Sequence, residues 1–192
     1  MSVIVAIKKN GVIYMGADSQ CSKGYHRSTL LNDIGFKIAK LDNGILMGFC
    51  GRVATMQSIL AIKDLFTLDE NNKLTKKHIV TQIIPKIMDK FDEIGNEKYG
   101  AITGSILLAH QDKLYRITSG LDVLSINNAV SIGAGMDFAH HALYCMPDAP
   151  VNERLLSALE ESANWVESVD GPFVLIDTQN LQYKIVSAGG AN

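Results

Sequence analysis

The sequence predicts an α+β protein in which antiparallel sheets are covered by pairs of helices. Apolar residues alternate along strand-like runs that come in pairs, and two pairs are joined by Asn-Gly turns, at Asn10-Gly11 and Asn43-Gly44. Such turns are strong hairpin signals. The helix-like runs also come in pairs, whereas a doubly wound parallel sheet would alternate strands with helices. The order of elements therefore favours antiparallel sheets with helices segregated on their faces.

The strands are expected where apolar and polar residues alternate or where short apolar runs end in turn residues. These runs cover residues 2–7, 12–18, 36–41, 45–50, 103–109, 114–118, 130–132, 173–177 and 182–186. The polar stretch 19–32 between the first two hairpins has no such pattern. We expect it to form a loop.

The helices are expected where apolar residues recur every three or four positions. This spacing predicts helices over residues 53–66, 79–91, 137–146 and 152–166. Thr75 is the expected N-cap of the second helix and Gly95 its stop. Pro85 lies inside this helix and predicts a kink, because proline has no N–H to donate.

Composition places the chain among globular proteins of one domain, spanning residues 1–192. Of its 192 residues 47% are hydrophobic, and 18 basic against 20 acidic side chains leave a net charge of -2. This balance provides no field for nucleic acid or an anionic membrane, and no apolar run reaches the roughly 20 residues that span a bilayer. Three cysteines without CxxC spacing favour a reducing compartment, so we expect a cytoplasmic protein.

Several classes of site are excluded because their sequence motifs are absent. The chain has no GxGxxG after a strand, no phosphate-binding loop and no HExxH. His140 and His141 are adjacent on an expected helix and point about 100° apart, so they do not chelate one ion together. We therefore expect no metal and no cofactor.

The N-terminus offers a different chemistry. Ser2 follows Met1, which is normally removed before a small residue, and its removal gives one residue both a hydroxyl and a free α-amine. An α-amine has a pKa of about 7.7–8.0 and acts as a base near neutral pH. The reaction also needs a cation, an acid that orients it and an N–H for an oxyanion. Lys37, Asp18 and Gly51 are available for these tasks.

Together these residues resemble a family. The segments SVIVAIKKNGVIYMGADS, FKIAKL and GFCGRVAT, with SIGAG further along the chain, are similar to the proteasome β-subunit superfamily and within it to the bacterial HslV peptidases. The resemblance covers nearly the whole chain and is specific over the first 55 residues. It implies the four-layer αββα sandwich of the N-terminal-nucleophile (Ntn) hydrolases.

The resemblance also assigns the site. Ser2 falls on the nucleophilic threonine of the family, Asp18 on its acid, Lys37 on its lysine and Gly51 on the glycine whose N–H serves the oxyanion hole. Four residues fall on the specificity pocket, which should be apolar and prefer neutral hydrophobic side chains: Gly35, Ala39, Phe49 and Val53. The implied activity is that of a threonine/serine-type endopeptidase acting on unfolded polypeptides.

Three departures from the family pattern keep two alternatives open. The nucleophile is serine, Ala134 replaces a serine near the amine, and neither Asn164 nor Trp165 supplies the second acid; Glu167 and Asp170 are the nearby carboxylates. One alternative is a catalytically inactive structural subunit of the same fold. The other is an Ntn amidase acting on small amides.

The resemblance implies partners as well. Subunits of this type stack into rings that enclose their sites, so we expect a homo-oligomeric ring of six or seven copies, single or stacked in two. Because this chain has no phosphate-binding loop, a separate ATP-dependent unfoldase would have to supply folded substrates.

Overall fold

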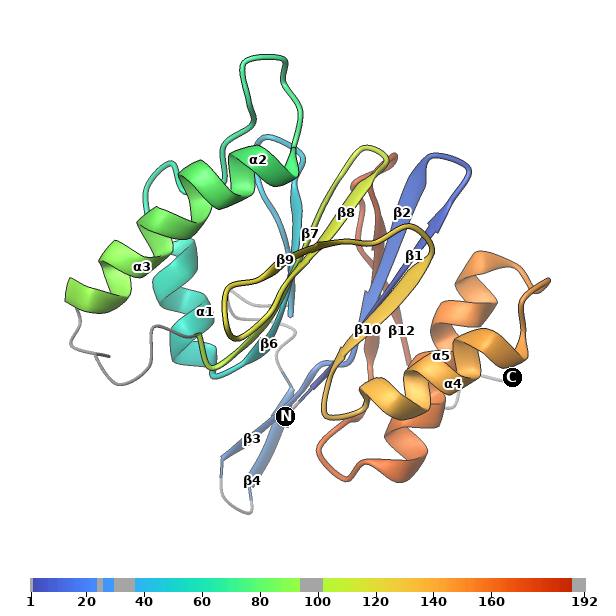
Figure 1. Ribbon diagram of the computed structural model, residues 1–192. Helices are drawn as coiled ribbons and strands as arrows, with labels where there is room; N and C mark the ends of the chain where they lie inside the picture. The colour runs from blue at the N-terminus through green and yellow to red at the C-terminus, as the bar shows by residue number, and fades with distance from the viewer. Residues whose placement is uncertain (1, 24–25, 30–36, 94–101, 188–192) are drawn as a thin grey trace.

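The computed structural model describes residues 2–23, 26–29, 37–93 and 102–187. These residues form four layers: helices α1–α3, one five-stranded sheet, a second five-stranded sheet, and helices α4–α5 (Figure 1). The α+β sandwich expected from the sequence is confirmed.

The N-terminal sheet has the strand order β10-β1-β2-β11-β12, and all its neighbouring strands are antiparallel. Its strands are β1 (Val3–Lys9), β2 (Val12–Ala17), β10 (Ala129–Gly133), β11 (Phe173–Asp177) and β12 (Lys184–Val186). Asn10 and Gly11 both have positive φ, 52° and 79°, as a two-residue I′ turn requires. The first expected hairpin is therefore confirmed with its turn.

The second sheet has the order β5-β6-β7-β8-β9 and is also antiparallel. Its strands are β5 (Ile38–Lys40), β6 (Leu46–Gly51), β7 (Gly104–His110), β8 (Lys113–Ile117) and β9 (Val123–Ser125). A separate polar hairpin, β3 (Gln20–Lys23) with β4 (His26–Thr29), pairs where we expected a loop. Neither of its strands carries the apolar alternation that marks a half-buried strand.

The helices cover the two outer faces. On the second sheet lie α1 (Val53–Leu60), α2 (Lys76–His78), a π-helical turn η1 (Ile79–Ile83) and α3 (Ile84–Glu93); on the N-terminal sheet lie α4 (Met136–Cys145) and α5 (Val151–Trp165). Thr75 accepts the N–H of His78 at 3.2 Å, which confirms it as a cap. The π-helical turn η1 ends at Ile83, just before Pro85, which has no backbone N–H to donate. Gly95 lies outside the described residues.

Helix α1 ends six residues earlier than expected. Asp64 adopts a left-handed conformation with φ of 51°, which a continuing right-handed helix does not allow. The apolar residues beyond this point still reach the core: Leu65 is 2% exposed. Periodicity alone therefore overestimated the length of the helix.

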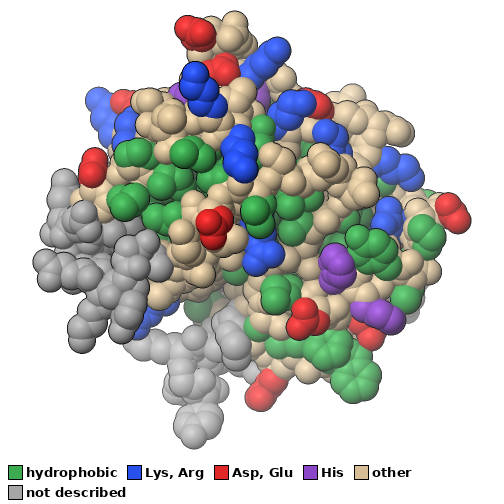
Figure 2. All heavy atoms as spheres, viewed as in Figure 1, with side chains coloured by type: hydrophobic (Ala, Val, Ile, Leu, Met, Phe, Trp, Pro, Cys, Tyr) green, Lys and Arg blue, Asp and Glu red, His purple; other side chains and the backbone are tan. Residues whose placement is uncertain are grey.

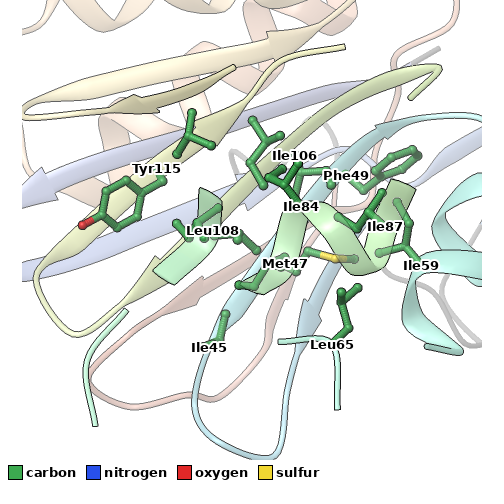
Figure 3. Packing of buried hydrophobic residues seen from close by; sticks show 14 of the residues in the cluster. Ile45, Met47, Phe49, Ile59, Leu65, Ile84, Ile87, Ile106, Leu108 and Tyr115 are labelled. Carbon is green, nitrogen blue, oxygen red and sulfur yellow. The ribbon is translucent and has the colours of Figure 1, made fainter. Parts of the chain in front are cut away.

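Among the described residues, three apolar clusters hold the layers together. Leu46 on β6 packs between the two sheets, and the next residue, Met47, packs under α1–α3. Figure 3 shows this outer cluster, in which Met47 and Phe49 meet Ile84, Ile87 and other aliphatic side chains. Because both faces of the central strands are buried, the two sheets are packed firmly against each other. The candidate site lies at the end of this interface to which β1 and β6 contribute. Among the described residues no helix is long and apolar enough to cross a membrane.

Candidate active site

A buried ion pair stands at the start of the N-terminal strand. The Nζ atom of Lys37 lies 2.6 Å from Oδ2 of Asp18, and the two side chains are 6% and 0% exposed. The other carboxylate oxygen of Asp18, Oδ1, accepts the N–H of Val3 at 2.8 Å. The carboxylate thus connects the lysine to the residue that directly follows Ser2.

Burial dominates the electrostatics of this pair. It lowers the pKa of Lys37 and raises the pKa of Asp18 from their ordinary values, while the attraction between the two opposes both shifts. Removing two charges from water is expensive and is offset only by good geometry and further hydrogen bonds. A lysine whose pKa is lowered by burial and that has a specific charge partner marks a candidate functional site.

Ser2 is 6% exposed and lies against the turn that follows β10. Its carbonyl oxygen accepts the N–H of Gly135 at 3.4 Å. A Cβ on Gly133, whose φ is 99°, would overlap this same carbonyl, so the close approach requires glycine. The turn between β10 and α4 therefore fixes the backbone of Ser2.

Two serines hold this turn in place, although Ala134 itself has no hydroxyl. The Ser131 hydroxyl donates to the carbonyl of Met136 at 2.8 Å, and that of Ser162 donates to the carbonyl of Gly135 at 3.0 Å. Sequence reasoning gave neither residue this role: Ser131 lies in the SIGAG segment but was assigned no contact, and Ser162 lies outside the motifs that carry the resemblance.

The end of β6, in the second sheet, lies beside the turn between β10 and α4. A Cβ on Gly133 would lie 3.4 Å from Cβ of Cys50, which puts Cys50 and the following Gly51 beside the turn that contacts Ser2. Gly51 pairs with Gly104 across β6 and β7, with φ values of 155° and 146°. A side chain on either glycine would overlap the backbone of the other strand.

This glycine pair gives a prediction about stability. Gly51→Ala and Gly104→Ala should each destabilise the fold by more than the roughly 1–2 kcal/mol that a positive φ costs a residue with a Cβ, because the added Cβ would also collide with backbone. Gly11→Ala is the matched control, since Gly11 has positive φ but nothing within 4 Å of its Cβ position. Urea unfolding of the three variants tests this, and equal losses would contradict it.

The residues expected in the pocket are only partly described. Phe49 is 3% exposed within the cluster under α1–α3, and Ala39 packs against that cluster. The Cζ atom of Phe49 lies 2.8 Å from the Cβ position of Gly51, and Val53 begins α1. Gly35 lies outside the described residues. The assignment of these four residues to a substrate pocket stays a prediction.

A loop after α5 adds contacts that the sequence did not indicate. An interaction with the backbone of Asp170 lowers the pKa of the Asp18 carboxyl, and the Asp170 carbonyl accepts the N–H of Ser19 at 3.2 Å. The Asp170 carboxylate instead accepts the N–H of Gly171 at 2.8 Å, and Gln20 donates to the carbonyl of Glu167 at 3.3 Å. This loop thus supports Asp18 through its main chain.

Asn164 and Trp165, the positions near which the family has its second acid, carry no carboxylate. Trp165 is 67% exposed and donates its indole N–H to Glu161 at 2.8 Å, and Asn164 lies beside it near the end of α5. In the described part of the chain no three His, Cys, Asp or Glu side chains are placed to hold a metal ion.

Comparisons with known proteins show the family to which the chain belongs. The proteasome subunit family matches residues 2–145. The ATP-dependent protease subunit HslV of Borreliella burgdorferi (strain ZS7) is 30% identical over 162 residues, which are 83% of this chain and 82% of the relative.

Two solved structures are similar in fold. BPH of Thiobacillus denitrificans, solved in complex with epoxomicin, has a TM-score of 0.74 at 16% identity, covering 94% of this chain and 99% of that one. Anbu (ancestral beta-subunit) from Yersinia bercovieri has a TM-score of 0.75 at 15% identity, covering 97% and 88%.

The layers, the sheet order and these similarities define the Ntn-hydrolase fold of the proteasome type. Within that fold class the chain belongs to the proteasome subunit family.

Proposed function

We propose that this chain is a serine-type Ntn endopeptidase of the proteasome β type, with Ser2 as the nucleophile once Met1 is removed. The observation that carries the proposal is the buried pair of Lys37 and Asp18, joined at 2.8 Å to the N–H of Val3, the residue next to Ser2. A buried pair of this kind stabilises a fold poorly compared with apolar side chains. Its position beside a potential nucleophile favours a chemical role.

The reaction follows from the groups present. The free α-amine of Ser2 takes the proton of Oγ as Oγ bonds to the carbonyl carbon of a peptide, and the Lys37 ammonium favours the alkoxide. The N–H of Gly51 stabilises the oxyanion. The amine then gives its proton to the leaving nitrogen as the C–N bond breaks, and water hydrolyses the resulting ester to free Ser2 Oγ.

Substrates are proposed to be unfolded polypeptides with neutral hydrophobic side chains at the cleavage site, as the apolar character of Ala39, Phe49 and Val53 favours. The chain has no phosphate-binding loop, and its relative is named as a subunit of an ATP-dependent protease. We therefore propose a separate ATP-dependent unfoldase as partner, with both proteins in the cytoplasm.

Substrate selection tests this part of the proposal. The isolated particle should degrade a casein-like unfolded protein slowly and without ATP, and should leave a stably folded protein intact. Incubation of both substrates with and without ATP, followed by electrophoresis, measures this. Cleavage of the folded substrate by this chain alone in an ATP-dependent way would contradict the proposed partner.

Assembly into a ring of six or seven copies, single or stacked in two, is proposed as well. Both outer helix layers expose large apolar side chains, among them Val80 at 47%, Tyr144 at 63% and Trp165 at 67%. Figure 2 shows such side chains gathered in patches on one face of the molecule, and contiguous apolar patches mark contacts between proteins.

Light scattering tests the assembly. We expect a particle of many subunits at micromolar concentration, because single copies would leave these patches in water and the peptidase site open to folded proteins. A strict monomer at that concentration would contradict the ring.

Intact mass of protein produced without a tag separates the peptidase from the inactive alternative. Loss of Met1 frees the amine that the mechanism needs. A native chain that keeps Met1 has an amide in its place and would be a structural subunit, the reading favoured by Ala134 and by the absence of a carboxylate at Asn164.

A further inference from the structure

Helix α4 carries a thiol and an imidazole that contact each other away from the candidate active site. Cys145 and His141 are one turn apart, and Sγ lies 3.7 Å from Nδ1 and 3.8 Å from Nε2 of the ring. Both residues are exposed. The peptidase reaction uses neither of them.

The separation of these atoms fits two ligands of one tetrahedral ion. With bonds of about 2.3 Å to sulfur and about 2.0–2.1 Å to nitrogen, a tetrahedral angle separates the two ligand atoms by about 3.6 Å. Positions i and i+4 on a helix also place two ligands on one face, the spacing that helical zinc motifs use. Because Sγ lies almost equally far from both ring nitrogens, the imidazole has to turn about its side-chain bonds to aim one nitrogen at the ion.

We propose that His141 and Cys145 form a surface binding site for a thiophilic divalent cation such as Zn²⁺. The sulfur binds as thiolate, so the thiol releases its proton to solvent when the ion binds, and binding tightens as the pH rises. The described residues supply no third ligand to this group, and water completes the coordination. A site with two protein ligands is open, and exchanges its ion with solvent.

The same helix provides a matched control. His140 is adjacent in sequence but points about 100° away, and its ring packs against Tyr144 with centroids 4.8 Å apart. The other two cysteines are less accessible than Cys145: Cys50 is buried and Cys21 is half-buried. The absorption of a metal ion bound to the thiolate at this site must therefore disappear when Cys145 is replaced.

The test is titration of the full-length, tag-free protein with Co²⁺, in a buffer whose reductant is not a thiol. We expect a near-ultraviolet thiolate-to-cobalt absorption band that saturates at one ion per chain and is displaced by Zn²⁺. Removing a group that hydrogen-bonds to a metal ligand weakens metal binding by about 10–100-fold, so the loss of a direct ligand should weaken it at least as much. Cys145→Ser should abolish the band, His141→Asn should weaken binding by about tenfold or more, and His140→Asn should change neither.

Two results would overturn the proposal. One is a thiolate band that persists in Cys145→Ser, which would place the ion on another cysteine. The other is equal affinity of wild-type, His141→Asn and His140→Asn proteins, which would show that the imidazole is no ligand. Circular dichroism of each variant confirms that α4 is still folded, since all three side chains are exposed.

Discussion

Replacing Ser2 with alanine is expected to abolish the hydrolysis of hydrophobic peptide amides. The variant keeps a small residue after Met1, so the initiator is still removed and the α-amine is still present, but no hydroxyl remains to form the acyl ester. Loss of the nucleophile from a working site should lower kcat by at least about 10³-fold. Fluorogenic peptide amides with apolar side chains provide the measurement.

Two further variants make this result specific. Ser2→Thr keeps a hydroxyl beside the amine and should retain turnover, and Ser125→Ala removes an exposed hydroxyl on β9 and should leave turnover unchanged. Intact mass must show the loss of Met1 in each protein. Full activity of Ser2→Ala would exclude the N-terminal mechanism, and with it the proposed peptidase reaction.

The fold could be predicted where local signals and the global structure agree. Asn10-Gly11 has the positive φ values that the turn needs, and the strands on either side alternate or are fully apolar. The polar hairpin β3–β4 was missed because its strands bury no apolar row that would reveal them. The end of α1 at Leu60 is not marked in the apolar period, which continues toward Phe66; the left-handed conformation of Asp64 shows only that the helix does not continue through that residue.

The site was predictable only as far as its motifs extend. Asp18 and Lys37 lie in segments similar to the family, and their 2.6 Å contact is what that similarity led us to expect. The interaction of Asp18 with the backbone of Asp170 involves a main-chain group that any residue type would supply. It therefore cannot be predicted from a pattern of side chains. The same holds for the N–H of Gly135 on the carbonyl of Ser2.

Removing the positive charge of Lys37 should affect folding and turnover together. Lys37→Met leaves the Asp18 carboxylate, whose side chain is 0% exposed, buried without its cation, which typically costs about 3–5 kcal/mol of stability. Burial already raises the pKa of Asp18, and without the lysine it is raised further. A carboxyl whose pKa is higher in the folded than in the unfolded state destabilises the fold above that pKa.

The sign of the pH dependence follows from this shift. As the pH falls through the raised pKa of Asp18, the folded variant takes up a proton and the destabilisation disappears. Urea unfolding of Lys37→Met should therefore show a large loss relative to wild type at pH 8 and a smaller one in mild acid. A loss that is independent of pH would contradict an unpaired buried carboxylate as its cause.

The double variant Lys37→Met, Asp18→Asn separates folding from catalysis. It removes both charges, keeps an acceptor for the N–H of Val3, and should recover most of the stability lost in Lys37→Met. Turnover should nevertheless stay about 10²–10³-fold below wild type, the loss that removal of one preorganised group stabilising a developing negative charge typically causes. If this folded double variant hydrolyses peptide amides within about tenfold of the wild-type rate, the ion pair serves the fold and the proposed role of Lys37 in the reaction is wrong.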